Sequence, residues 1–251
     1  MSEDRDAAAR RARIEALRAA EKAKAKRRKA GAIGAVVLAL AVIGGGIAWA
    51  VTGGGNSNST GAFCGNVAPG SPNGKHWSSA PAMTIDTSAS YKAVLNTSCG
   101  DIGISLDARN APKTVNSFVF LAQQSYFNHT HCHRLTTTGI YVLQCGDPTA
   151  TGTGGPGYTI PDEYLNDPAI KGGTYPAGTV AMANSGPNTN GSQFFLVYQD
   201  SRLPPSYTPF GTITSGLDIL QRIGKDGVKG GGTDGTPNDN VTINSVPVTK
   251  S

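Results

Sequence analysis

The feature of this chain that most constrains its fold is a run of apolar residues near the N-terminus. Residues 31–51 contain no charged side chain. As a helix rising about 1.5 Å per residue, they are long enough to cross a hydrocarbon layer of roughly 30 Å. Lys and Arg precede the run, and a stretch rich in Gly, Ser and Asn follows it. The positive-inside rule therefore predicts a cytoplasmic N-terminus, a lipid-contacting helix over residues 31–52, and export of the rest of the chain.

A cleaved signal peptide is the alternative interpretation of this run. Residues 48–50 (Ala-Trp-Ala) resemble a small-x-small cleavage site. The apolar part of a signal peptide usually has about 7–15 residues, however, and this run is longer and follows a long basic segment. We therefore favour an anchor that is not cleaved.

The composition on either side of the run divides the chain into four parts. We expect a basic cytoplasmic tail (1–30), the membrane helix (31–52), a flexible linker rich in Gly, Ser, Asn and Pro (53–82), and a folded domain (83–251). The tail holds 11 of the 22 Lys and Arg residues and 5 of the 17 Asp and Glu residues, so the remainder is close to neutral. Because nucleic-acid-binding domains concentrate Lys and Arg on their folded part, we expect no nucleic-acid partner.

The folded domain shows short apolar runs separated by turns that contain Gly, Pro or Asn. Strands are predicted near residues 93–95, 102–106, 140–143, 179–182, 193–198 and 241–243. This spacing is typical of a mainly β, antiparallel sandwich or barrel. Residues 111–122 are predicted to be helical, because a Pro lies near their start and apolar side chains recur on one helical face. Residues 216–223 predict a shorter second helix.

All four cysteines fall on the side of the chain that we expect to be exported, where disulfides persist. Cys132 and Cys145 flank two predicted strands, which a hairpin would bring together. We therefore expect the pairs Cys132–Cys145 and Cys64–Cys99. Four free thiols are the alternative.

Residues 129–133 (His-Thr-His-Cys-His) contain side chains that zinc prefers. Alternation along a strand would place His131 and His133 on one face and Cys132 on the other. The chain has no second His/Cys cluster that would complete a tetrahedral site. We therefore expect no metal ion and no cofactor.

Two segments carry more specific chemistry. Residues 132–135 (CHRL) and 141–147 (YVLQCGD) present the guanidinium of Arg134 and the amide of Gln144 beside aliphatic residues. Residues 182–196 (MANSGPNTNGSQFFL) form a turn followed by a strand. Each segment alone is compatible with an ordinary hairpin, and Arg134 alone with an ion pair on an edge strand. Together and in this order, the two segments closely resemble the cyclophilin family.

The resemblance spans about residues 90–248 and implies a mainly β fold, an eight-stranded antiparallel barrel capped by two helices. It implies peptidyl-prolyl cis/trans isomerase activity on proline-containing segments, with Arg134 as the catalytic residue. The residues expected to bind substrate are His133, Tyr141, Val142, Gln144, Ala183, Asn184, Ser185, Gln193, Phe195, Leu203 and Tyr207. Among them Val142, Phe195, Leu203 and Tyr207 correspond to the proline pocket, and residues 183–185 to the segment that binds peptide backbone.

The chain departs from the family pattern in three places. Between Arg134 and Gln144 it is two residues longer than usual, so Ile140 competes with Tyr141 for the aromatic position of the pocket. Arg202 stands where many relatives have Trp, and Tyr207 where they have His. We expect a monomeric, membrane-anchored isomerase that acts on exported proteins. The alternative is a module that binds proline segments or acts as a chaperone, with incidental isomerase activity.

Overall fold

A computed structural model of the chain describes residues 63–250. The expected tail (1–30), the expected membrane helix (31–52) and residues 53–62 of the expected linker lie outside the described residues. Across residues 63–250, no helix combines the length and the apolar character that a membrane crossing requires.

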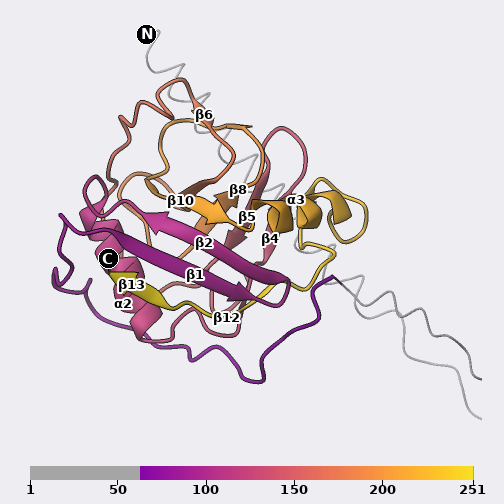
Figure 1. The fold of residues 1–251 in the computed structure, drawn as a ribbon, viewed down its shortest axis with the longest axis horizontal. Coiled ribbons are helices and arrows are strands. Elements are labelled where there is room, and N and C mark those ends of the chain that lie inside the picture. Colours follow the sequence, from indigo (N-terminus) through magenta and orange to yellow (C-terminus); the bar gives the residue numbers. More distant parts are fainter. Residues whose placement is uncertain (1–62, 251) are drawn as a thin grey trace, which may run out of the picture. The chain divides into compact units, whose positions relative to one another are not determined.

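Most of the strands belong to one antiparallel sheet (Figure 1). Its strands are β1 (Tyr91–Thr97), β2 (Gly100–Leu106), β3 (Thr130–His131), β4 (Arg134–Thr136), β5 (Val142–Cys145), β7 (Thr179–Met182), β8 (Phe194–Val197), β10 (Pro209–Ser215), β11 (Asp234–Gly235), β12 (Thr242–Ser245) and β13 (Val248–Lys250). They are ordered β11-β4-β5-β8-β7-β10-β2-β1-β12-β3, with β13 beside β1. A separate pair joins β6 (Thr174–Tyr175) to β9 (Ser201–Arg202).

The expected mainly β fold with antiparallel strands and two helices is confirmed, in the form of a half-barrel. Its strand count differs from the expected eight, because the described residues place eleven strands in the main sheet. Some of the additional strands are two-residue pieces. Residues 130–136 are divided into β3, which pairs with β12, and β4, which pairs with β5. Residues 130–136 thus run from β3, at one end of the strand order, to β4, which lies next to β11 at the other end.

The strands β5 and β8 separate two apolar clusters, because successive side chains point to opposite faces of a sheet. Phe194 and Leu196 on β8 belong to the main core, whereas Phe195 and Val197 belong to a second, smaller cluster. All four residues of β8 are therefore buried. The second cluster lies on the face of the sheet where we expected the proline pocket.

The two predicted helices are present and lie near opposite ends of β1 and β2 (Figure 1). Helix α2 (Pro112–Gln123) has a Pro in its first turn and buries the predicted apolar face. Its Phe118 packs against three rings of the core, those of Phe127, Phe194 and Phe210. Helix α3 (Leu217–Asp226) extends three residues beyond the predicted end and buries Leu220 and Ile223.

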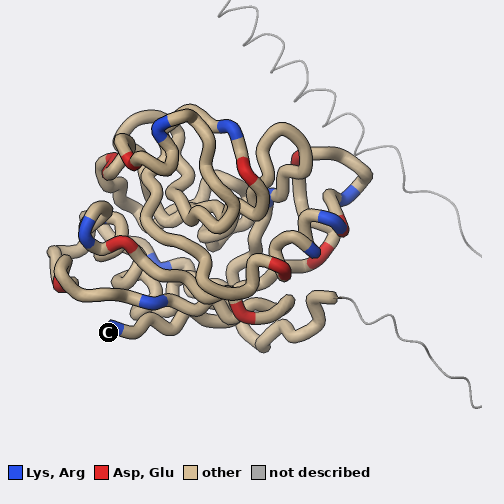
Figure 2. Tube along the Cα trace, turned by 45° about the horizontal axis from the view of Figure 1, so that its top comes forward, with Lys and Arg blue, Asp and Glu red and all other residues tan. Residues whose placement is uncertain are grey.

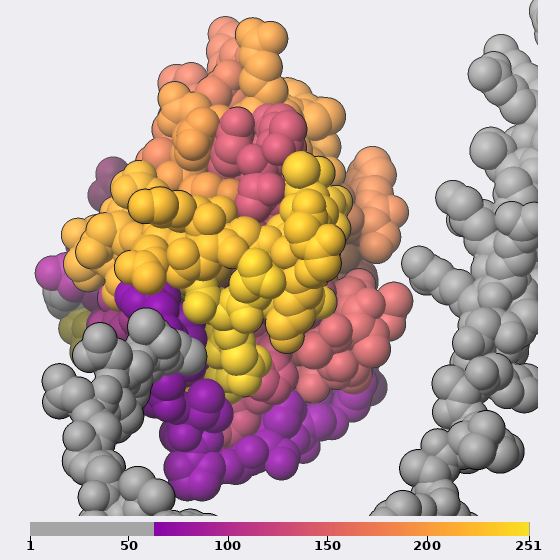
Figure 3. Space-filling model, turned by 90° about the vertical axis from the view of Figure 1, so that its right-hand side faces the viewer, coloured from indigo at the N-terminus to yellow at the C-terminus, as the bar shows by residue number. Residues whose placement is uncertain are grey.

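Residues 63–82, which we call the N-terminal arm, are the part of the expected linker that the structure describes. The arm has no regular secondary structure, but it packs on the body of the domain. Its Asn73 amide donates hydrogen bonds to the carbonyl oxygens of Gln124 and Ser125. The Trp77 ring lies 5.1 Å from that of Phe120. Figure 3 shows the indigo-to-violet atoms of this N-terminal part along the lower edge of the molecule, beneath yellow atoms from the C-terminal part.

Both predicted disulfides are confirmed. Cys64 bonds to Cys99 and so attaches the N-terminal arm to the turn between β1 and β2. Cys132 bonds to Cys145 and links the segment before Arg134 to the end of β5. Each bond therefore ties an irregular segment either to a strand of the sheet or to the turn between two strands.

Ion pairs contribute little to holding this fold together. Figure 2 shows Lys and Arg interspersed with Asp and Glu along the described trace. The three ion pairs found among residues 63–250 join Arg134 to Asp234, Arg222 to Asp226, and Lys250 to Asp86, and each of these side chains is at least 30% exposed. Exposed pairs contribute about 0–1 kcal/mol each. Apolar packing and the disulfides therefore dominate the stability.

We expect the double variant Cys64→Ser, Cys99→Ser to lower the free energy of unfolding by roughly 2–5 kcal/mol, because this disulfide restricts the unfolded chain. Urea denaturation of the full chain would measure the loss. The matched control replaces Cys132 and Cys145, which are 13 residues apart rather than 35, and should lose somewhat less. An unchanged denaturation midpoint in the first variant would contradict the structural role of the bond.

Candidate active site

The candidate site begins with a row of residues that strand pairing places side by side. Arg134 on β4 is opposite Gln144 on β5, and Gln144 is opposite Phe195 on β8. Phe195 is in turn opposite Ala181 on β7. The antiparallel register therefore brings a guanidinium, an amide and an aromatic ring together from strands that lie far apart in the sequence.

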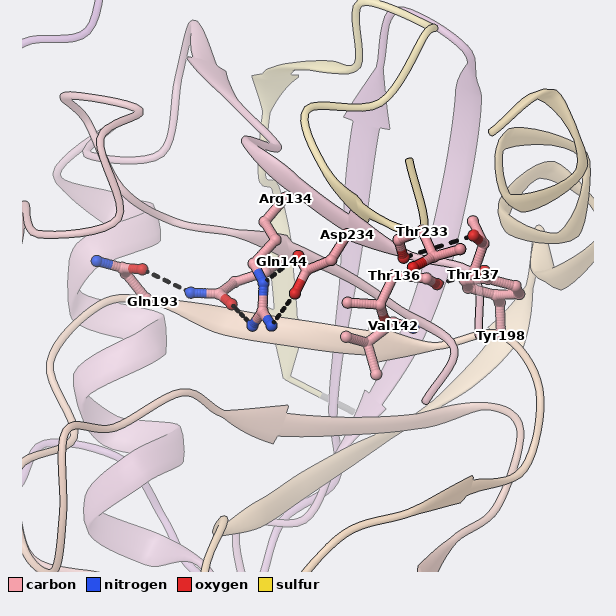
Figure 4. Close-up of polar contacts among 9 residues, drawn as sticks. All are labelled: Arg134, Thr136, Thr137, Val142, Gln144, Gln193, Tyr198, Thr233 and Asp234. Carbon is pink, nitrogen blue, oxygen red and sulfur yellow. Dashed lines mark hydrogen bonds and ion pairs between the residues drawn. The ribbon is translucent and has the colours of Figure 1, made fainter. Parts of the chain in front are cut away.

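Hydrogen bonds connect the polar members of this row (Figure 4). Arg134 Nη1 donates to Gln144 Oε1 at 3.4 Å, and Gln144 Nε2 donates to Gln193 Oε1 at 2.8 Å. Gln193 Nε2 then donates to the carbonyl oxygen of Gly154 at 2.9 Å. We call this series the amide relay. It fixes the orientation of both glutamine amides relative to the guanidinium.

Asp234 holds the other side of the guanidinium. Its two carboxylate oxygens accept hydrogen bonds from Arg134 Nε at 2.7 Å and Nη2 at 2.8 Å. The short strand β11 positions this carboxylate by pairing with β4. The hydrogen bonds from Arg134 hold the pKa of Asp234 below its ordinary value, and the same contact raises the pKa of Arg134. The arginine is thus permanently charged and is oriented from two sides.

The second apolar cluster adjoins this row. Val142, Phe195, Ala181, Ile170, Tyr175 and Val197 are buried in it, and Ile140, Ala183, Leu203 and Tyr207 pack against it. The ring of Tyr207 lies 5.6 Å from that of Phe195 in an edge-to-face arrangement. Burial raises the pKa of Tyr175 to about 12, so its hydroxyl stays neutral and donates to the Tyr207 carbonyl oxygen. The cluster thus offers apolar and aromatic surface beside Arg134.

A polar groove of about 700 Å³ adjoins the two glutamines, Gln144 and Gln193. Gln144 and Gln193 line it together with Ala183, Asn184 and Ser185. The Asn184 side chain donates to the Ser206 carbonyl oxygen, which ties this segment to the one that carries Tyr207. A peptide lying along residues 183–185 would therefore touch both the groove and the apolar cluster.

Asp147 organises the loop at the end of the amide relay. Its carboxylate is fully buried and accepts hydrogen bonds from the backbone N–H groups of Thr149, Thr151, Gly152 and Gly154. Burial acts to raise the pKa of Asp147, but hydrogen bonds from the Thr149 hydroxyl and from the backbone N–H groups outweigh it, and the pKa lies below its ordinary value. The buried carboxylate of Asp147 therefore fixes the position of Gly154, whose carbonyl oxygen accepts the hydrogen bond from Gln193.

The structure brings together most of the residues that the sequence predicted for the site. Arg134, Gln144 and Gln193 meet in the relay. The predicted pocket residues Val142, Phe195, Leu203 and Tyr207 meet in the apolar cluster. The predicted backbone segment lines the groove. The assignment of substrate-binding roles to these side chains remains a prediction.

Tyr141 and His133 lie elsewhere. The ring of Tyr141 packs against Tyr198 and lines a different hollow beside α3, because strand alternation turns it away from Val142. Ile140 packs against the apolar cluster in its place. His133 Nε2 faces Gly152, and neither ring nitrogen has a hydrogen-bond partner among the described residues. Burial lowers the pKa of His133, which favours the neutral form of the ring.

Sequence reasoning missed Asp234, Asp147 and Tyr175. Asp234 lies 100 residues from Arg134 in a Gly-rich loop, where an acidic residue looks like an ordinary turn residue. Asp147 follows the Gln144 motif closely, and the Thr- and Gly-rich stretch after it is the signal that a carboxylate collects backbone donors there. Tyr175 carried no local signal.

The ion pair gives a pH-dependent prediction. Arg134 favours the charged form of Asp234, so any stability from the pair is present at neutral pH and is lost as the pH falls through the lowered pKa. We expect Arg134→Ala to raise the pKa of Asp234 toward its ordinary value. Carboxyl-carbon NMR titration of the full chain would measure it.

Asp147 is the internal control for that titration, because its low pKa arises from the Thr149 hydroxyl and from backbone donors and not from Arg134. It should stay low in the Arg134→Ala variant. If the pKa of Asp234 did not change while that of Asp147 rose, the variant would have disturbed the loop, and the assigned ion pair would be wrong.

Comparison with known proteins agrees with this geometry. The family model described as Cyclophilin type peptidyl-prolyl cis-trans isomerase/CLD matches residues 92–248. "Probable peptidyl-prolyl cis-trans isomerase B" of Mycobacterium leprae is 55% identical over 167 residues, which cover 63% of this chain and 57% of the relative. The protein of the same description from Mycobacterium tuberculosis is 56% identical over 163 residues, covering 60% and 52%. The chain thus matches little more than half the length of these curated relatives.

A solved structure extends the comparison to the fold. The crystal structure of a cyclophilin type peptidyl-prolyl cis-trans isomerase from Cryptosporidium parvum superposes with a TM-score of 0.54 at 28% identity, covering 64% of this chain and 99% of that protein. A second structure of that protein was determined in the presence of the dipeptide Ala-Pro. Since the family model matches more than half of the sequence, this chain belongs to the cyclophilin-type peptidyl-prolyl cis/trans isomerase family.

Proposed function

We propose that this chain catalyses cis/trans isomerisation of X-Pro peptide bonds. The observation that carries the proposal is the guanidinium of Arg134, fixed by Asp234 and Gln144 at the edge of the apolar cluster around Phe195. A charged donor held beside apolar and aromatic surface suits a substrate that combines a hydrophobic ring with a polar amide. Proline is such a substrate.

The chemistry of the X-Pro bond explains what the site has to do. Rotation about a peptide bond meets a barrier of about 18–20 kcal/mol because the nitrogen lone pair is delocalised into the carbonyl. The two X-Pro isomers differ by only about 0.5–1 kcal/mol, so a catalyst has to lower the barrier and not shift the equilibrium. Rotation transfers no electrons and no chemical group. The reaction therefore calls for positioned donors and surfaces.

Arg134 provides the donor in this scheme. When the bond twists, the proline nitrogen becomes pyramidal and its lone pair becomes a hydrogen-bond acceptor. Asp234 and Gln144 engage three of the five N–H groups of the guanidinium, which leaves two for a substrate. A bond from one of them to the pyramidal nitrogen is stronger in the twisted state than in the planar state, which is the condition for catalysis.

The surrounding residues provide positioning. The apolar cluster, with Phe195, Leu203 and Tyr207, would receive the proline ring. Residues 183–185 and Gln193 would hold the flanking main chain, so that one side of the bond turns against the other. His133 supports the loop next to the site in this scheme. No covalent intermediate and no general base are needed.

The proposal predicts a large loss of activity on truncation of the arginine. In the full chain, Arg134→Ala should reduce the catalysed exchange rate of an Ala-Pro peptide on the order of 100-fold, as expected for removal of a fixed transition-state donor. Exchange NMR at equilibrium measures this rate without a coupled enzyme. Binding of the peptide should change much less, because the bond to nitrogen forms only on twisting.

Arg222→Ala is the matched control for that experiment. Arg222 is also an exposed arginine paired with an aspartate, but it lies on α3. Its truncation should leave the exchange rate unchanged. Failure of the wild-type chain to accelerate exchange, while its fold is intact, would contradict the proposal.

A proline-segment binding module is the second candidate, and the contact with Asp234 is the observation that favours it. The carboxylate partly neutralises Arg134, and the hairpin that carries Arg134 is longer than the family pattern. If cells that carry Arg134→Ala kept the function of the wild type, binding would describe the protein better than catalysis.

We further propose that the domain acts as a monomer on exported proteins, outside the cytoplasm, and is held to the membrane by residues 31–52. Two disulfides support an oxidising compartment. The basic residues before the apolar run support the orientation. Slow X-Pro steps of exported chains would be the reaction that the protein assists.

Protease protection tests this orientation. We expect protease added to intact cells stripped of their wall to digest the domain, and the domain to sediment with membranes. A cytoplasmic protein serves as the control for cell integrity. A domain that stays protected until lysis would contradict the proposed orientation.

A further inference from the structure

The polar groove beside the glutamines has one wall that comes from outside the family-matched residues. His76 lines this groove, and it belongs to the N-terminal arm, whereas the family model begins at residue 92. The same groove is lined by Gln144, Gln193 and residues 183–185, which the proposed function places against substrate. The arm thus reaches the neighbourhood of the reacting bond.

The arm is fixed at this position and does not merely lie near it. The Trp77 N–H donates to the carbonyl oxygen of Pro156 at 2.9 Å, and the Trp77 ring packs against Phe120 and Tyr126. Gly157 has a φ of +91°, and a Cβ at this position would lie 2.6 Å from the Trp77 carbonyl oxygen and 3.4 Å from His76 Nδ1. The absence of a side chain at Gly157 therefore allows the arm to form the wall of the groove.

The other groups that line the groove are uncharged. They include no Asp, Glu, Lys or Arg. The Tyr158 hydroxyl is bonded to Ser117, and burial raises the pKa of Tyr158. His76 is therefore the one lining residue with a basic side chain, and an imidazole ring carries no negative charge. The lining residues thus include a basic group that can attract an anion but no acidic group that would attract a cation.

Several other polar side chains that line the groove already form hydrogen bonds within the protein. Gln193 Nε2 donates to Gly154, the Thr189 hydroxyl donates to the Gly186 carbonyl oxygen, and the Ser192 hydroxyl donates to the Gly146 carbonyl oxygen. The ring of His76, in contrast, forms no hydrogen bond with another residue of the described chain, and the residue is exposed. It is thus available to a substrate side chain.

We propose that His76 is a specificity-determining residue that selects a carboxylate side chain, Asp or Glu, next to the proline of the substrate over Lys or Arg. The proposal rests on the proposed function, because it assumes that proline segments bind beside Gln144 and Gln193. It assigns to the N-terminal arm a role in choosing substrates.

Peptide series test the proposal with the full chain. Each series carries Glu, Gln, Lys or Ala at one position flanking an Ala-Pro unit, and NMR titration gives the affinity. At one flanking position we expect the Glu peptide to bind about 2- to 5-fold more tightly than the Lys peptide, the range expected for an exposed charge contact. The ratio should approach one in His76→Ala and should invert in His76→Glu.

Lys75→Ala is the matched control. Lys75 is the neighbouring cation of the arm, but its Nζ bonds to the Gln124 carbonyl oxygen and it does not line the groove. This variant should keep the wild-type ratio. A ratio of one in the wild type at every position, a ratio unchanged in His76→Ala, or a ratio abolished by Lys75→Ala would each overturn the assignment.

The peptide with Ala at the flanking position separates this proposal from the isomerase proposal. Its exchange rate in the wild type reports catalysis on a substrate without a charged flanking side chain. If no peptide were isomerised but the Glu/Lys binding ratio still depended on His76, the isomerase proposal would fail and the selection by His76 would stand.

Discussion

The guanidinium of Arg134 has only donors, and this one property determines the direction of every hydrogen bond in the amide relay. Gln144 has to present its oxygen to Arg134, so its nitrogen faces Gln193. Gln193 then has to present its oxygen to Gln144, so its nitrogen faces Gly154. The two amides therefore have no freedom to flip without breaking a bond. The charged guanidinium of Arg134 thus sets the orientation of the Gln144 and Gln193 amides that line the groove.

Much of the fold was predictable because it depends on local patterns. The alternation of apolar residues identified β2, β7 and β8, and the 3.6-residue repeat identified α2. The same alternation explains why β8 is buried on both faces, since one set of its side chains joins the core and the other joins the apolar cluster. The pairing of Cys132 with Cys145 followed from the hairpin that they flank.

The parts that the sequence did not reveal depend on contacts between distant segments. The arm looked like a linker because its composition is rich in Gly, Ser, Asn and Pro, and nothing local shows that Trp77 has a binding surface on α2. Asp234 reaches Arg134 only because β11 pairs with β4. Tyr141 precedes Val142 directly, and neighbouring residues of a strand point to opposite faces, so Ile140 and not Tyr141 packs against the apolar cluster.

The bond between Asp234 and Arg134 raises a question of balance, because a carboxylate that orients a guanidinium also offsets its charge. Asp234 is 53% exposed and Arg134 is 42% exposed, so water screens their mutual attraction. The two hydrogen bonds between Asp234 and Arg134 fix the orientation of the guanidinium. Screening by water weakens this orientation less than it weakens the attraction between the two charges. A side chain that is not held in place would have to reorganise in each turnover before it could donate to the twisted peptide bond. A fixed orientation of the guanidinium therefore helps catalysis more than a stronger positive charge would. The Cys132–Cys145 bond and the loop around Asp147 restrain the two ends of the amide relay. The parts of this site therefore share rigidity.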